Sequence, residues 1–191
     1  MVSLDLSGDA LAVGLVDLPA FFSACGRYRY WLARDIGGDG RGGPALFILH
    51  NPSTADASRD DPTIRRCIGY ARRFGCRRMI AVNRVAVRAT DPAAVFTAAD
   101  PVGPLNDAAI ARAAAVVGAG CGIIVAAWGA FGTNAAQRRV CQRRDEAVVP
   151  LLAEAELHAL GVTRAGHPRH PLYLAATARP RSWRPPRPTE V

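Results

Sequence analysis

The sequence predicts a single α/β domain with a central, mostly parallel sheet flanked by helices. Two observations lead to this fold class. Short apolar segments with strand character recur along the chain, at residues 45–49, 79–82, 123–127 and 157–160. Helical patterns separate them, and strand–helix–strand spacing is typical of the crossover connections that join parallel strands. A chain of 191 residues is long enough for one domain with a sizeable core.

Local signals mark the first elements. Residues 27–36 are dense in aromatics and predict a strand, which a glycine-rich turn links to the strand at 45–49. Asp61 is a good N-cap, and Pro62 suits the first helical position that follows it. Apolar residues then recur at helical spacing until Gly75, where we expect the helix to end.

The second half of the chain continues the alternation. Helical stretches are expected from about residue 93, over 105–117 and from about 133, with Pro150 breaking or kinking the last of them. These elements assign residues 1–177 to the α/β domain. Residues 178–191 are rich in proline and arginine, and we expect them to form a basic, flexible tail.

The chain carries a formal net charge of +8, and all 24 of its basic residues are arginines. Codon bias in a GC-rich genome explains the missing lysine, but not the excess of basic over acidic residues. A basic surface attracts phosphates and acidic ligands, and nucleic acid is the commonest such partner. The charge therefore favours a nucleic-acid partner without establishing one.

Composition also argues against several classes of protein. No apolar run approaches the ~20 residues of a membrane helix. The first 18 residues include acidic residues and no basic ones, unlike a signal peptide, so a cytoplasmic monomer without membrane contact is expected. The five cysteines lack C-x-x-C spacing, and their apolar neighbours indicate core positions in a reducing compartment. We therefore expect no metal and no cofactor.

Polar segments follow four of the predicted strands, at the ends where an open parallel sheet binds its ligands. They are residues 50–53 (His-Asn-Pro-Ser), Asn83, residues 128–129 (Trp-Gly) and residues 167–170 (His-Pro-Arg-His). The first three also have structural explanations, as an Asx or Ser turn, a loop cap and a glycine turn before a helix. The two His-Pro pairs around Arg169 are less ordinary and favour a site for an anion or a leaving group.

Taken in order, these four segments resemble the motifs of the uracil-DNA glycosylase superfamily. Asn51-Pro52 resembles the family's water-positioning turn, and Asn83 resembles the strand-end asparagine that reads uracil. Trp128-Gly129 and His167-Pro168 resemble the last two motifs. The chain is also similar, over nearly its full length, to an uncharacterised group of bacterial proteins. That group shares the Asn-Pro-Ser-Thr-Ala-Asp, Arg-Ala-Thr-Asp-Pro, Ala-Trp-Gly and His-Pro-x-His-Pro-Leu-Tyr segments.

The glycosylase resemblance implies a glycosylase-like fold and an enzyme of base excision repair. Such an enzyme hydrolyses the N-glycosidic bond of uracil, or of a related deaminated base, in DNA. His167 or His170 would match the family histidine and donate a hydrogen bond to the departing base. Asn83 would read the base edge. Asn51 would position a water molecule, with Asp56 as an alternative base.

The same resemblance implies contacts to base and DNA around these residues. His50, Pro52 and Ser53 would lie against the base. Ser53 and Arg169 would contact the DNA backbone, and Leu172 would act as a wedge when the base flips out of the duplex.

Two other functions stay open at this stage. Leu49 stands where the glycosylase family usually has glycine, and an asparagine at position 51 cannot ionise as a carboxylate base does. A nucleic-acid-binding module that lost catalysis tolerates both departures. An enzyme acting on free nucleotides or nucleosides would use the same pocket without the arginine-rich tail.

Overall fold

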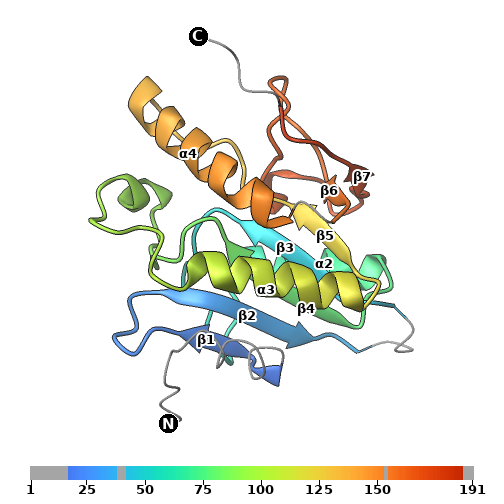
Figure 1. The fold of residues 1–191 in the computed structure, drawn as a ribbon. Coiled ribbons are helices and arrows are strands. Elements are labelled where there is room, and N and C mark those ends of the chain that lie inside the picture. Colours follow the sequence, from blue (N-terminus) through green and yellow to red (C-terminus); the bar gives the residue numbers. More distant parts are fainter. Residues whose placement is uncertain (1–16, 38–41, 153–154, 187–191) are drawn as a thin grey trace.

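A mixed seven-stranded sheet runs through the part of the protein that the structure describes (Figure 1). The structure is a computed structural model, and it describes residues 17–37, 42–152 and 155–186. The strand order is β1-β2-β4-β3-β5-β6-β7. The strands are β1 (Ala20–Phe22), β2 (Arg29–Asp35), β3 (Ala45–Leu49), β4 (Arg78–Asn83), β5 (Ile123–Ala126), β6 (Leu157–Ala159) and β7 (Arg181–Ser182).

The prediction of a mostly parallel sheet is wrong, because both edges are antiparallel. β4, β3, β5 and β6 form a parallel centre, as the crossover spacing indicated. β1 pairs antiparallel with β2, β2 with β4, and β7 with β6. Residues 23–28, which join β1 to β2, are too few for a crossover and allow only a hairpin. The aromatic pattern of residues 27–36 identified a strand, but such a pattern does not encode its direction.

Helices cover both faces of the sheet (Figure 1). α2 (Pro62–Arg73) packs on one face, and α3 (Asn106–Ala119) on the other, where α4 (Ala135–Val148) also lies. Three 3-10 helices complete the described elements: η2 (Pro92–Phe96), η3 (Val149–Leu152) and η4 (Pro171–Tyr173). The break expected at Pro150 is therefore a change from α-helix to 3-10 helix. In the described part of the chain, no helix has the length and apolar character needed to cross a membrane.

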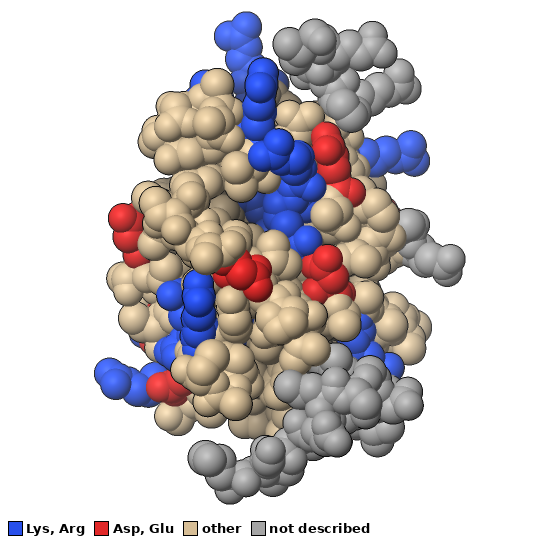
Figure 2. Space-filling view, turned by 60° about the vertical axis from the view of Figure 1, so that its left-hand side comes forward, with Lys and Arg blue, Asp and Glu red and all other residues tan. Residues whose placement is uncertain are grey.

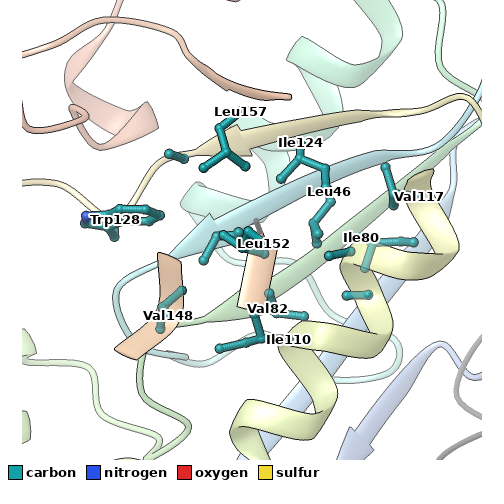
Figure 3. Packing of buried hydrophobic residues seen from close by; sticks show 14 of the residues in the cluster. Leu46, Ile80, Val82, Ile110, Val117, Ile124, Trp128, Val148, Leu152 and Leu157 are labelled. Carbon is teal, nitrogen blue, oxygen red and sulfur yellow. The ribbon is translucent and has the colours of Figure 1, made fainter. Parts of the chain in front are cut away.

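Strand β3 lies at the centre of the core, where none of its residues exceeds 3% exposure. Its side chains alternate between the two faces of the sheet. Leu46 and Ile48 belong to the cluster that includes α3 (Figure 3), whereas Phe47 and Leu49 pack with α2. Because side chains alternate along every strand, this pattern determines the face that each residue at a strand end takes.

The segment that follows the predicted domain is partly attached to the sheet. Arg181 and Ser182 form β7, and Trp183, at 8% exposure, belongs to the same cluster as α3. The Trp183 indole N–H donates to the carbonyl of Gly166 at 2.9 Å. Residues 187–191 of the predicted tail lie outside the described residues.

Asp61 is expected to stabilise the fold through two contacts that can be separated. Its carboxylate accepts the Ile64 N–H at 2.8 Å, which caps α2, and its charge acts on the buried Arg29. We expect Asp61→Ala to lower the free energy of unfolding by about 2 kcal/mol or more, measured by urea denaturation. Asp61→Asn keeps a capping acceptor and should cost less than Asp61→Ala. Equal losses in the two variants would show that the cap contributes nothing.

Candidate functional site

The carboxyl ends of three neighbouring strands bring His50, Asn83 and Trp128 to one edge of the sheet. Leu49 stands opposite Asn83 in the β3–β4 ladder. Backbone hydrogen bonds continue past the strands, from Arg84 N to the Leu49 carbonyl at 2.8 Å and from Ala127 N to the Ile48 carbonyl at 2.9 Å. The backbone therefore holds these three positions firmly relative to one another.

His50 is held by a buried arginine. The Nη2 atom of Arg84 lies 2.8 Å from Nδ1 of His50. The Arg84 guanidinium also forms an ion pair with Asp145 of α4. It lies over the Trp128 ring as well, at 5.7 Å from the ring centroid. Arginine only donates, so Nδ1 of His50 accepts and the ring proton is on Nε2. Burial, with the Arg84 charge adding to it, lowers the pKa of His50 to about 2. The ring is therefore a neutral imidazole that offers an Nε2–H group.

A second histidine approaches the same place through Phe131. The Phe131 ring stacks on His50, with centroids 4.2 Å apart and planes at 13°, and meets the edge of His170 at 6.2 Å. Gly129 makes this packing possible: its φ is 76°, and a Cβ there would lie 3.0 Å from the Phe131 ring and 3.2 Å from the His170 Cβ. The glycine turn after β5 thus brings an aromatic ring between two imidazoles.

His170 has the same tautomer as His50. Its Nδ1 accepts the Leu172 N–H at 3.4 Å, as the N-cap of η4. Burial lowers the pKa of His170 to about 4, and the charge of Asp61 opposes part of that shift. A ring whose Nδ1 accepts, and which is neutral near pH 7, carries its proton on Nε2. The site therefore contains two neutral imidazole donors, both in contact with the Phe131 ring.

Asn83 is a buried amide whose hydrogen-bonding groups are not used. It is 0% exposed, and neither Nδ2 nor Oδ1 has a partner among the described residues. By strand alternation its side chain lies on the α2 face, whereas His50 and Arg84 lie on the opposite face. His50 Nε2 and the Trp128 indole nitrogen also lack partners within the described part of the chain. All three strand ends thus carry a buried polar atom that has no partner among the described residues.

Asn51 and Pro52 tie the loop after β3 to the loop after β4. The Asn51 Nδ2 donates to the carbonyls of Pro52 and Ala89, at 3.0 and 2.8 Å. The Ala89 N–H in turn donates to the Pro52 carbonyl at 2.9 Å. Ser53, the next residue, is half-buried and makes no hydrogen bond within the described chain. The Asn51 amide is thus oriented by its own N–H groups, which leaves its Oδ1 for another donor.

Asp56 belongs to its own turn instead of the strand-end cluster. Its Oδ1 accepts from the backbone N–H groups of Ser58 and Arg59, at 2.9 and 2.8 Å, and from the Ser58 hydroxyl. Hydrogen bonds from the two backbone groups lower the pKa of Asp56. This carboxylate is a turn-stabilising group in the structure.

The histidine loop separates its two imidazoles. His167 lies in a turn in which the Thr163 N–H donates to the His167 carbonyl and the His167 N–H donates to the Thr163 hydroxyl. Among the described residues, its ring contacts neither Phe131 nor His50. His170 makes the ring contact described above. Arg169 is exposed and donates to the Tyr173 carbonyl at 3.3 Å, and Leu172 is 37% exposed.

Sequence reasoning missed the residues that organise this site: Arg84, Asp145 and Phe131. Arg84 did carry a signal, because a charged residue directly after a buried strand needs a partner. Phe131 and Asp145 carried none, since their roles depend on tertiary contacts. Within the described residues, no group of three or more His, Cys, Asp or Glu side chains is placed to bind a metal ion.

The depressed pKa of His170 predicts a pH dependence of stability. The unfolded ring binds a proton near pH 6.5 and the folded ring only near pH 4, so stability falls as the pH drops through this window. Between pH 7.5 and 4, the free energy of unfolding should fall in the wild type and fall less in His170→Asn, which keeps a capping acceptor. The difference between the two decreases should be up to about 3 kcal/mol. Urea denaturation across this range measures the difference, with His167→Asn as the control. A parallel decline in wild type and His170→Asn would contradict the buried, neutral ring.

Comparison of the chain with known proteins identifies a family, but that family has no assigned activity. The chain matches a family model described as "Protein of unknown function (DUF1643)" over residues 29–172, a range that contains His50, Asn83, Arg84, Phe131 and His170. No curated protein and no solved structure matches the chain. The match agrees with the similarity to an uncharacterised bacterial group. The chain belongs to the DUF1643 family of proteins of unknown function.

Proposed function

We propose that this protein is a DNA glycosylase that releases uracil, or a related deaminated base, from DNA by hydrolysing its N-glycosidic bond. The observation that carries the proposal is the unpartnered, fully buried amide of Asn83 at a strand end. Leaving a buried donor or acceptor without a partner costs about 1–3 kcal/mol. A ligand that supplies both partners explains why the chain tolerates that cost.

The edge of uracil fits such an amide. A carbonyl oxygen and a ring N–H lie side by side on this base, so Nδ2 of Asn83 can donate to the first while Oδ1 accepts from the second. Cytosine presents an amino group and an unprotonated nitrogen at these positions, which leaves both atoms of the same amide rotamer without partners. Because Asn83 has no exposed surface, a base reaches it only when a neighbouring segment shifts.

The two imidazoles suit the leaving group. Breaking the N-glycosidic bond leaves negative charge on the base, and a preorganised donor stabilises that charge as it develops. His170 and His50 are neutral and carry their protons on Nε2, so each presents one Nε2–H donor while its Nδ1 accepts a hydrogen bond from the protein. His170 is the less enclosed of the two and therefore the better candidate for direct contact with the base.

Asn51 is the candidate for positioning the water molecule that attacks the sugar. Its Nδ2 is fixed by two carbonyls, so its Oδ1 is available to orient a water molecule toward the sugar. An amide cannot take the proton, and its contribution comes from orientation alone. Asp56, the alternative base, is engaged in its own turn.

That arrangement also supports a second candidate, a nucleic-acid-binding module without catalysis. Its supporting observation is the commitment of Asp56 to its own turn, together with an asparagine where a catalytic carboxylate would be expected. An enzyme acting on a free nucleoside or nucleotide is the third candidate. Base release from uracil-containing DNA, binding without release, and activity on the monomer alone distinguish the three.

The catalytic prediction concerns the two histidines of the last loop. We expect His170→Ala to slow single-turnover release of uracil from a short oligonucleotide by on the order of 10²–10³, similar to the loss of an oxyanion donor, while ground-state binding changes less. His167→Ala is the matched control: His167 lies three residues before His170 in the same loop, its ring has no described contact with Phe131, and the variant should retain most of the rate. Full activity of His170→Ala, or no base release by the wild type, would contradict the mechanism.

The specificity prediction concerns Asn83. In Asn83→Asp a carboxylate replaces the amide and presents only acceptors, so discrimination between uracil and cytosine should shift toward cytosine. Release rates for matched oligonucleotides that contain one or the other base measure the shift. A variant that folds and keeps the wild-type preference would remove Asn83 from the base site.

A further inference from the structure

A groove lined by arginines runs beside α2, outside the cluster of polar atoms at the strand ends. It encloses about 430 Å³. α2 forms one wall, and the segment that follows His170 forms the other. We call it the α2 groove, and its lining residues are Pro62, Arg65, Arg66, Gly69, Tyr70, Arg73, Leu172 and Ala176.

No carboxylate of the described residues neutralises the arginines of the α2 groove. Its lining includes three arginines and no acidic residue. In the described part of the chain, Arg65, Arg66 and Arg73 form no ion pair with a carboxylate. By contrast, on the face of the protein shown in Figure 2, acidic side chains lie beside the basic ones. The α2 groove is therefore a positively charged site that suits an anionic ligand.

Gly69 leaves open space beside α2 at the α2 groove. It lies inside α2, where glycine destabilises a helix relative to alanine. Its backbone is helical without a positive φ, and a Cβ added there would meet no atom within 4 Å. Neither backbone conformation nor packing within the protein explains this glycine. The open space beside it admits a ligand that lies close against the helix.

The α2 groove is connected to the candidate site through its second wall. Leu172 lines the groove, and its backbone N–H donates to Nδ1 of His170. The Tyr70 hydroxyl donates to the Ala175 carbonyl at 2.8 Å, which fixes this wall to α2. A polymer that lies in the α2 groove would thus extend toward His170, which is two residues from the groove residue Leu172.

We infer that the α2 groove binds the phosphate backbone of a nucleic-acid strand whose neighbouring nucleotide lies at His170. Arg66 and Arg73 are about 10.5 Å apart along the helix axis, a spacing that suits successive phosphates of one strand better than a single phosphate group. This favours a polymer over a free phosphate. The inference rests on the nucleic-acid partner of the proposed function and not on catalysis.

The first test measures how the groove arginines contribute to binding. The probe is a fluorescein-labelled oligonucleotide with one uracil, single- or double-stranded, followed by fluorescence anisotropy. We expect Arg66→Ala and Arg73→Ala each to weaken binding roughly fivefold to tenfold and to lower the salt slope by about 0.7–0.9, the loss of one phosphate contact. Arg77→Ala removes the same charge at the amino-terminal end of β4, away from the groove, and should leave affinity near wild type.

The second test uses Gly69 against a matched helix glycine. Gly69→Ala should raise Tm by roughly 2 °C and yet weaken oligonucleotide binding, because the new methyl group enters the groove. Gly118 of α3 also has no atom within 4 Å of an added Cβ. Gly118→Ala should raise Tm similarly and leave binding unchanged. Stabilisation by Gly69→Ala without any loss of affinity would overturn the proposed contact.

These tests separate the groove from the catalytic proposal. Base release with no effect of the groove variants on affinity or salt slope would overturn the inference and leave the glycosylase proposal standing. Oligonucleotide binding that the groove variants weaken, without release of the base by the wild type, would support the inference and contradict the glycosylase proposal. Tighter binding of phosphatidylserine vesicles than of the oligonucleotide, or displacement of the oligonucleotide by equimolar inorganic phosphate, would overturn the assignment to nucleic acid.

Discussion

The buried guanidinium of Arg84 is the constraint on which the strand-end cluster depends. Removing such a charge from water costs several kcal/mol unless partners surround it. Its partners come from three elements: Asp145 of α4, His50 after β3 and the ring of Trp128 after β5. α4 buries only Cys141 and Val148, so apolar packing alone would hold this helix weakly. Arg144 adds a hydrogen bond to the Arg84 carbonyl and an ion pair with Asp107. The same polar network therefore positions α4 and orients His50.

The chemistry of the cluster follows from this network. An arginine on Nδ1 leaves His50 one tautomer, and the N-cap of η4 leaves His170 the same one. Burial keeps both rings neutral near pH 7, so each ring presents a single donor, its Nε2–H group. Asn106 of α3 fixes the backbone at the end of β4, since its Nδ2 donates to the carbonyls of Asn83 and Arg84, at 3.0 and 2.9 Å. Donors held this way lose little entropy when a ligand arrives, which is the physical content of preorganisation.

Sequence reasoning found the elements whose signals are local and missed those that depend on tertiary contacts. The strand at β3 and the start of α2 at Asp61 were readable from an apolar run and a capping pair. β1 and β7 were not predicted as strands, and the direction of β2 was not readable, because side-chain pattern does not encode strand direction. α4 is polar on nearly every face, so no apolar stripe identified Asp145 as the inward residue. Asn83 was found because it is a polar residue that closes an apolar strand. His167 and His170 each precede a proline, and only the structure brings one of them against Phe131.

Strand alternation places a further requirement on any ligand of this site. The Asn83 amide lies on the α2 face of the sheet, whereas His50 and Trp128 lie on the face of α3. A molecule that contacts both sets must therefore lie across the sheet edge, beyond the backbone of Leu49 and Asn83. Phe131 and His170 lie at this edge, and the η4 segment extends from there to α2, where it forms a wall of the α2 groove. The η4 segment thus has the α2 groove on one side, while His170 at its start contacts Phe131 beside the strand ends. In the proposed binding mode, the phosphates would lie beside α2 and the base would lie at the sheet edge.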